Sequence, residues 1–263
     1  DHRDLHSFPT RRSSDLSWPS CHLEPSLRYL KKTGMKPLAF FITGTDTEIG
    51  KTTIATALLF QAQQHGLSTL ASKPIASGCE LTALGLRNQD ALLLQQQCSI
   101  RIPYPILNPY AFEPPIAPHI AAAQVQQRLN VQELQQAIEP VLQKQADLTL
   151  IEGAGGWHVP LNDEQRLSDL ALTLNLPIIV VVGIRLGCIN HALLTIESIQ
   201  NSGLPIAGWV ANQCQPTTPA HLDNVAYLRQ QIARPMLGVV PYLAQPTPAL
   251  VSSYLDLTPI LQA

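Results

Sequence analysis

The chain contains 263 residues, 45% of them hydrophobic, and carries a formal net charge of −2. This length is sufficient for one large α/β domain, or two small ones, around a well-buried core. The near-neutral charge argues against nucleic acid as a partner, and the absence of an apolar run of roughly 20 residues argues against a membrane-spanning protein. The five cysteines are odd in number and form no CxxC pair. We therefore expect neither a disulfide framework nor a zinc site, and we expect a cytoplasmic protein.

The first 34 residues differ in pattern from the rest of the chain. They mix Pro, Ser, Arg and His without periodicity, and charges interrupt the apolar core that a secretory signal needs. We expect residues 1–34 to be a non-native or disordered extension, with a transit peptide as the alternative. Met35 stands immediately before the first clear strand, so we expect residues 35–263 to form the functional domain.

From Met35 onward, apolar runs alternate with amphipathic stretches. The apolar runs predict strands at residues 38–44, 68–74, 147–153, 177–183, 205–212 and 235–241. The amphipathic stretches predict helices at residues 51–66, 91–97, 130–146, 169–175 and 190–203, and within 219–233. The Pro-rich stretch 102–119 is expected to be a long loop, ordered or disordered, and Pro140 is expected to kink its helix. Nearly continuous apolar strands separated by helices indicate an α/β domain with a mostly parallel sheet and helices on both faces.

The first predicted strand runs into the sequence GTDTEIGKT, at the end of a strand where ligands of parallel sheets bind. Gly44 and Gly50 permit a backbone path that turns amide N–H groups inward, and the following helix adds a partial positive charge. Lys51 then reaches β- and γ-phosphate oxygens, and the Thr52 hydroxyl is placed for Mg²⁺. The spacing differs from GxxxxGK[ST], which has glycine where this chain has Thr45. The favoured interpretation is a phosphate-binding loop in a single-domain P-loop NTPase-like fold, and the alternative is a structural turn.

A second cation, Lys73, follows the second predicted strand. Pro74 and the small residues Ser77 and Gly78 come after it, and this sequence suits an anion pocket. The alternative is a solvated lysine at the edge of the sheet.

Two carboxylates are candidates for binding a metal ion. Glu152 ends an apolar strand and precedes the small residues 153–156, which let the backbone approach a ligand closely. A carboxylate there would serve a Mg²⁺ ion that also touches phosphates; the alternative is a Gly-rich loop without metal. Asp90 is the second candidate, and it is equally suited to be the N-cap of the helix that follows.

The remaining polar candidates are asparagines and histidines. Asn212, at a strand end, is placed to hydrogen-bond the edge of an adenine or to stabilise a turn. Asn190 is a candidate N-cap for the helix in which His191 occupies the first turn. His191 is more plausible as a structural residue than as a general base, and His119 and His158 are weaker candidates still.

Seven segments of the chain resemble, in order, the dethiobiotin synthetase family of ATP-dependent ligases. They are TGTDTEIGKT, KPIASG, GLRNQDAL, NPYAFEPPIAPH, EGAGGWHVPL, VVGIRLGCINHALLT and GWVAN. The resemblance runs from about Met35 to the C-terminus, weakens after residue 215, and includes the unusual glycine spacing. It implies the carboxylation of 7,8-diaminononanoate with CO₂ and ATP, and ring closure to dethiobiotin through a carbamate and a carbamic-phosphoric anhydride. ADP and phosphate are released.

The resemblance also implies roles for residues at matching positions. Lys51 and Lys73 would be catalytic, the first at the β/γ-phosphate oxygens and the second at the carbamate and the transferring phosphoryl group. The diamine substrate would contact Lys73, Ser77 and Asn190. A Mg²⁺ cofactor would be held by Thr52, Asp90 and Glu152. ATP would be bound by Glu48, Ile49, Gly50, Lys51, Thr52, Thr53, Asp90, Glu152, Gly153, Ala154, Gly155, Asn212, Gln213, Pro241, Tyr242 and Leu243.

In this family a second subunit holds part of the substrate, through the region that matches residues 186–190. The resemblance therefore implies a homodimer, in which Asn190 is either an intersubunit substrate contact or a helix cap. Gln213 departs from the family pattern, which commonly has an acidic residue there, so the contacts on the adenine side are less defined. The tail, residues 244–263, matches poorly and is assigned no catalytic role.

Two other classes of P-loop protein are alternatives. MinD/ParA-like switch ATPases carry an additional lysine early in the loop, whereas here no lysine precedes Lys51 within the loop. A cobyrinate-type amidoligase would need an appended glutaminase domain with a cysteine nucleophile, and we expect none after the synthetase-like region.

Overall fold

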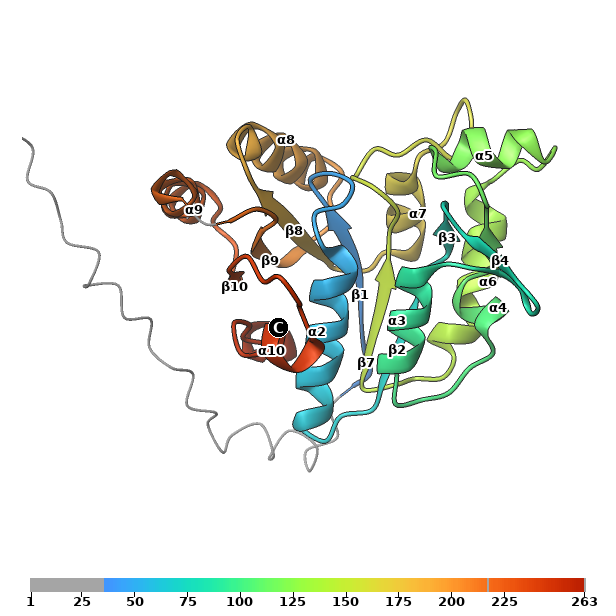
Figure 1. Cartoon of the computed structure of the whole chain (residues 1–263), viewed down its shortest axis with the longest axis horizontal. Coiled ribbons are helices and arrows are strands. Elements are labelled where there is room, and N and C mark those ends of the chain that lie inside the picture. Colours follow the sequence, from blue (N-terminus) through green and yellow to red (C-terminus); the bar gives the residue numbers. More distant parts are fainter. Residues whose placement is uncertain (1–35, 217, 263) are drawn as a thin grey trace, which may run out of the picture.

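The computed structural model describes residues 36–216 and 218–262, so the expected extension, residues 1–34, lies outside the described residues. Six parallel strands form a central sheet in the order β10-β9-β8-β1-β7-β2 (Figure 1). The strands are β1 Leu38–Gly44, β2 Thr69–Ser72, β7 Leu148–Glu152, β8 Ile178–Ile184, β9 Ile206–Gln213 and β10 Met236–Val240. All six coincide with predicted strands, which confirms the mostly parallel α/β sheet.

Helices cover both faces of this sheet, so its strands are buried. Every residue of β2, β7 and β8 is buried. On one face α2 packs with α3 and α10, and α6 to α9 lie on the other face (Figure 1). These helices are α2 Lys51–Gln64, α3 Gln89–Gln97, α6 Val131–Leu142, α7 Leu167–Leu174, α8 Cys188–Asn201, α9 Pro219–Gln231 and α10 Pro248–Ser252. Strands β7 and β8 flank β1 on opposite sides, so the loops after these strands gather at one edge of the sheet.

Two helix starts differ from the predictions. The N-cap of α3 is Asn88, whose side chain accepts a hydrogen bond from the Ala91 N–H, so the alternative of Asp90 as the cap is wrong. The helix α8 begins at Cys188 after the N-cap Gly187, which has a φ of 90°, so Asn190 is not a cap either. A side-chain pattern alone did not reveal that a glycine in the left-handed conformation starts this helix.

The Pro-rich stretch is ordered and contains more regular structure than predicted. It holds α4 (Tyr104–Leu107) and β6 (Tyr110–Ala111), and it leads into α5 (Pro118–Gln124). Both helices have proline in their first turn, where the missing N–H has no helical partner to lose. The strand β6 pairs in parallel with β3 (Ile75–Ala76), and this pairing fixes the stretch beside the segment that follows β2.

Further elements lie outside the predicted ones. An antiparallel hairpin is formed by β4 (Glu80–Thr82) and β5 (Gly85–Arg87). The tail forms α10 and α11 (Thr258–Leu261), and the buried Gln61 amide of α2 donates a 2.8 Å hydrogen bond to the Leu255 carbonyl of the tail. The tail is therefore part of the core. The helix α6 continues past Pro140 to Leu142, and the kink stays a prediction.

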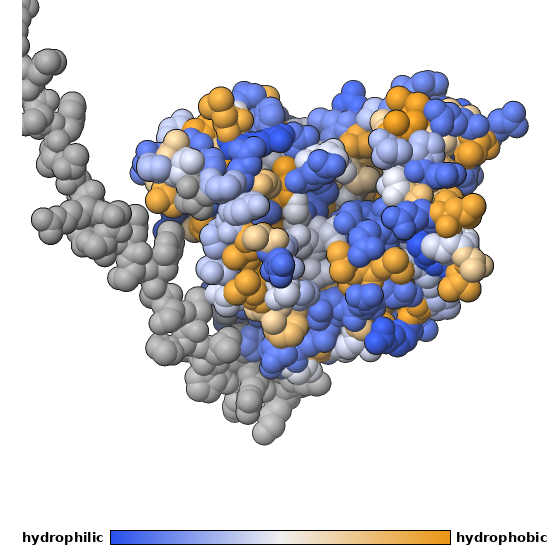
Figure 2. All heavy atoms as spheres, in the orientation of Figure 1, coloured by the Kyte–Doolittle hydropathy of each residue, from blue (hydrophilic) through white to orange (hydrophobic). Residues whose placement is uncertain are grey.

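Hydrophilic and hydrophobic residues intermingle over the face of the molecule in Figure 2. Within residues 36–216 and 218–262, no helix combines the length and apolar composition that crossing a membrane requires.

Candidate active site

A cavity of about 700 Å³ opens at the carboxyl edge of the sheet, beside the loop that joins β1 to α2. Its walls come from this loop, from the segments after β2 and β7, and from the Pro-rich stretch at Pro115–Pro118. The predicted site residues that line it are Glu48, Gly50, Lys51, Thr52, Thr53, Lys73, Ser77, Asp90, Glu152, Ala154 and Gly155. These residues are far apart in the chain, and the parallel order of the strands brings them together.

The loop between β1 and α2 has the conformation that an anion site requires. Gly50 is the N-cap of α2 with a φ of 85°, and no side chain caps the helix, so its first N–H groups are not occupied by a capping side chain. A Cβ atom at Gly50 would lie 2.3 Å from Nδ2 of Asn212, so only glycine fits here. Asn212 in turn donates a 2.7 Å hydrogen bond to the Ile49 carbonyl and ties the loop to β9.

Lys51 stands at the start of α2 with 7% of its surface exposed. Its ammonium donates a 2.9 Å hydrogen bond to the carbonyl oxygen of Asp46, within the same loop. Burial lowers the pKa of Lys51 to about 8, against the opposing attraction of Glu152. The side chain therefore remains largely a cation at neutral pH and lines the cavity beside the helix N-terminus.

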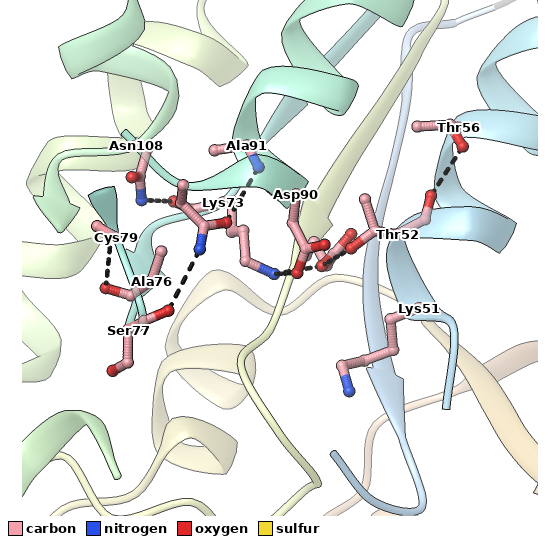
Figure 3. Close-up of polar contacts among 12 residues, drawn as sticks. Lys51, Thr52, Thr56, Lys73, Ala76, Ser77, Cys79, Asp90, Ala91 and Asn108 are labelled. Carbon is pink, nitrogen blue, oxygen red and sulfur yellow. Dashed lines mark hydrogen bonds and ion pairs between the residues drawn. The ribbon is translucent and has the colours of Figure 1, made fainter. Parts of the chain in front are cut away.

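A compact cluster of charged and hydroxyl groups surrounds Lys73 (Figure 3). The Lys73 ammonium donates to Glu152 Oε1 at 2.5 Å and to Asp90 Oδ2 at 3.1 Å, and the Thr52 hydroxyl donates to Glu152 Oε1 at 2.7 Å. Lys73 is 5% exposed and Glu152 is 1% exposed, so this ion pair is buried. The alternative of a solvated lysine at the sheet edge is wrong, because the chain after β2 turns into the site.

The charges in this cluster stabilise one another. Burial alone would lower the pKa of Lys73, but the negative charges and hydrogen bonds of Glu152 and Asp90 raise it above the ordinary value. Lys73 is therefore a permanent cation at physiological pH, available to interact with an anion in the cavity.

The donor set fits a hard divalent cation such as Mg²⁺. Glu152 Oε2 is buried and has no hydrogen-bond partner, while Oε1 is used by Thr52 and Lys73. Among the described residues, no group of three or more His, Cys, Asp or Glu side chains is placed to hold a metal. Two carboxylates and a hydroxyl suit Mg²⁺, which takes few protein ligands and completes its shell with phosphate oxygens and water.

Ser77 carries a second orphaned polar atom. Its hydroxyl oxygen is buried and has no hydrogen-bond partner, and the residue lines the cavity. The amide of Asn88 donates a 3.2 Å hydrogen bond to the Ser77 carbonyl and holds this segment in place (Figure 3). An unpartnered hydroxyl at this position is suited to a polar group of a ligand.

The sequence-based predictions missed the residues that hold Lys73. The amide of Asn108 donates a 2.7 Å hydrogen bond to the Lys73 carbonyl, and the Lys73 N–H donates to the Leu107 carbonyl at 2.9 Å. Tyr104 donates to Asn108 Oδ1 at 3.0 Å and accepts from the Asn88 N–H at 2.7 Å. In the sequence, the only indication was the presence of two polar side chains, Tyr104 and Asn108, in the Pro-rich stretch. Predicting this stretch as a loop assigns them no contact.

A second, smaller cavity has a volume of about 130 Å³. Thr53 lines both cavities. The predicted adenine-side residues that line the smaller one are Asn212, Gln213, Pro241, Tyr242 and Leu243. The structure thus brings this set together, and their contact with adenine stays a prediction.

Three predicted residues do not line either cavity. Ile49 is buried, with its side chain in the hydrophobic core. Gly153 is packed close to Phe41 and Leu167. Asn190 is exposed in the first turn of α8.

Among the described residues, neither His158 nor His191 shows a catalytic arrangement. His158 lines the large cavity, but its two ring nitrogens lie 3.3 Å from Ser168 Oγ and 2.7 Å from Ser198 Oγ, an arrangement typical of a structural histidine. His191 is exposed on α8.

Comparisons with known proteins agree with this geometry. Residues 39–249 match the protein family described as an AAA domain. The chain is 57% identical over 222 residues to the ATP-dependent dethiobiotin synthetase BioD of Pseudomonas aeruginosa strain UCBPP-PA14, covering 84% of this chain and 97% of that protein. It is 53% identical over 229 residues to the protein of the same name from Cellvibrio japonicus, covering 87% of this chain and 100% of that protein.

A solved structure supports the fold alone. The MinC:MinD cell division complex of Aquifex aeolicus matches with a TM-score of 0.52 and 12% identity, over 86% of this chain and 94% of the matched chain. At one edge of the sheet, the site combines a loop shaped by Gly50 with two lysines and two carboxylates. The identity to the curated dethiobiotin synthetases is high over nearly their full length. The chain therefore belongs to the ATP-dependent dethiobiotin synthetase family.

Proposed function

We propose that this protein converts 7,8-diaminononanoate, CO₂ and ATP into dethiobiotin, ADP and phosphate, as a step of biotin synthesis. The observation that carries the proposal is the buried Lys73–Glu152–Thr52 cluster beside the Lys51 loop, in a chain 57% identical to a named dethiobiotin synthetase. The four described cysteines are free, which supports a reducing compartment such as the cytoplasm.

The proposed chemistry needs positive charge and positioning more than acid–base catalysis. One amine of the substrate takes up CO₂ as a carbamate, a carbamate oxygen attacks the γ-phosphate, and the second amine displaces phosphate to close the ring. The carbamate and the transferring phosphoryl group are both anionic, so fixed cations stabilise the transition state. Lys73 reaches this region from the end of β2, Lys51 contacts the β/γ-phosphate oxygens, and the Ser77 hydroxyl binds the substrate.

Two groups of residues would hold ATP. The loop N–H groups and the residues of the large cavity bind the phosphates, and Asn212, Gln213 and Pro241–Leu243 surround the adenine. Thr52, Asp90 and Glu152 would hold Mg²⁺, which neutralises phosphate charge when bound. The orphaned Glu152 Oε2 supports this assignment.

We expect ATP consumption to require both bicarbonate and the diamine, because the phosphoryl acceptor is a carbamate that forms only from the two together. The measurement is phosphate release by the purified protein with each component omitted in turn. ATP hydrolysis that proceeds without the diamine, and is stimulated by lipid vesicles or DNA, would instead favour a switch ATPase.

We propose that the active protein is a homodimer, in which Asn190 binds substrate in the site of the partner subunit. The support is the exposure of Asn190 and of two apolar residues nearby, Leu186 (98% exposed) and Leu194 (57% exposed). Sedimentation should give twice the 28.7 kDa mass of one chain.

Mixed dimers test whether Asn190 acts across the interface. Asn190→Ala should raise the KM for the diamine by about tenfold, the usual effect of removing one hydrogen bond to a ligand. Refolding Asn190→Ala together with Lys51→Gln should restore the parental KM for the diamine in one site of each mixed dimer, because that site then has both native residues. A mixture that shows only the raised KM of Asn190→Ala would mean that Asn190 acts within its own subunit.

A further inference from the structure

The phosphate loop contains an acidic residue, Asp46, whose charge is unfavourable beside a triphosphate. Its carboxylate forms an ion pair with the Arg185 guanidinium, and its Oδ1 accepts a 2.7 Å hydrogen bond from the Thr47 N–H. Arg185 directly follows β8, and Figure 1 shows this strand in the same sheet as β1, its hydrogen-bonded neighbour. The ion pair therefore joins the loops that follow two adjacent strands. Neither Asp46 nor Arg185 lines the two cavities described above.

Asp46 is also in direct contact with the catalytic cation. The Lys51 ammonium donates to the backbone oxygen of Asp46 at 2.9 Å, so the carboxylate of the same residue is close enough for its charge to act on Lys51. Without the ion pair to Arg185, the Asp46 side chain would be free to rotate, and its carboxylate would become an anionic partner for Lys51 within the loop. Such a partner would compete with the phosphates for the ammonium.

Stability does not explain the ion pair. Both side chains are 39% exposed, and ion pairs with this exposure contribute little to the free energy of folding. A pair of this kind is more effective in fixing where a charge lies, because Coulomb energies near a protein surface are appreciable over distances of several ångströms.

We propose that Arg185 is a positioning residue for ATP binding, which holds the Asp46 carboxylate away from the phosphates and from Lys51. The guanidinium neutralises the one acidic side chain that the loop directs toward β8, and it leaves Lys51 and the loop N–H groups to the nucleotide. This proposal rests on the proposed assignment of residues 48–53 to the ATP phosphates. It adds a residue that touches neither ATP nor substrate but determines how strongly ATP binds.

The test is a charge-removal cycle on the full-length protein, measured by calorimetric titration with ADP and by the KM for ATP. Arg185→Gln should weaken ADP binding and raise the KM for ATP by about tenfold, with a smaller change in kcat, since an uncompensated carboxylate then lies near the phosphates. Arg185→Lys, which keeps the charge, should stay close to the parent protein. Asp46→Asn keeps an oxygen that can accept from the Thr47 N–H, and it should have a small effect.

The double variant Asp46→Asn/Arg185→Gln decides between charge positioning and a structural role. We expect it to bind ADP better than Arg185→Gln alone, because the harmful carboxylate is gone. If the double variant binds ADP as weakly as Arg185→Gln or more weakly, or if Arg185→Gln binds ADP normally, the proposal is wrong. Lys51→Gln tests the site assignment separately. If Lys51→Gln also binds ADP normally, residues 48–53 are not the phosphate site.

Discussion

Lys51→Gln is expected to reduce turnover by about 10³-fold, the scale of loss when one fixed group that stabilises a developing negative charge is removed. Glutamine is polar but carries no charge. Losing the hydrogen bond from residue 51 to the Asp46 carbonyl leaves the hydrophobic core unchanged. The thermal unfolding midpoint should therefore stay close to that of the parent protein. The measurement is phosphate release under saturating ATP, bicarbonate and diamine, with a parallel thermal melt.

Lys144→Gln provides the matched control, since Lys144 is exposed after the end of α6, outside both cavities. It should have parental turnover and stability. Parental turnover in Lys51→Gln would rule out a catalytic role for Lys51, and a large drop in its melting temperature would mean that the lysine is mainly structural.

Lys73→Gln is expected to affect both turnover and stability. Turnover should fall by about 10³-fold or more, because the cation nearest the proposed carbamate is lost. The free energy of unfolding should fall by about 3–5 kcal/mol, the usual effect of breaking a buried ion pair by removing one partner. The reason is that Glu152, which is 1% exposed, would keep a buried charge without its compensating cation.

A double variant separates the two effects. In Lys73→Gln/Glu152→Gln both buried charges are absent, so urea denaturation should show that most of the lost stability returns while turnover stays low. If Lys73→Gln is as stable as the parent protein, the two side chains do not form a buried ion pair in solution. If the double variant is less stable than Lys73→Gln, Glu152 stabilises the fold by contacts other than this pair.

The central sheet was predictable because its pattern is local. An apolar run such as residues 178–184 has no polar face to expose, so it requires cover on both sides wherever it lies in the sheet. The start of the phosphate loop's helix was predictable for a similar reason, since Gly50 and Lys51 are adjacent in sequence and the left-handed conformation of Gly50 is one that glycine readily adopts.

Other parts of the site depend on contacts between segments that are distant in the chain. The burial of Lys73 requires Glu152 from β7, Asp90 from α3 and a backbone held by Asn108. The strand β3 follows this lysine and pairs with β6 of the Pro-rich stretch, whereas the alternative considered from the sequence was a solvated lysine at the sheet edge. The spacing of residues around Lys73 in the sequence does not distinguish a buried lysine from a solvated one.

By itself, the sequence predicted the six strands of the central sheet with the main helices between them, the loop that begins at Gly44, and the candidate residues for a triphosphate, a metal ion and a carbamate. Only the tertiary structure decided that Lys73 and Glu152 form a buried pair, that Asn212 holds the loop from β9, and that Asp46 faces Arg185. The physical reason is that secondary structure follows from local backbone preference and apolar periodicity. The position of a charge, in contrast, follows from which distant strands become neighbours and from the groups they bring to the same edge of the sheet.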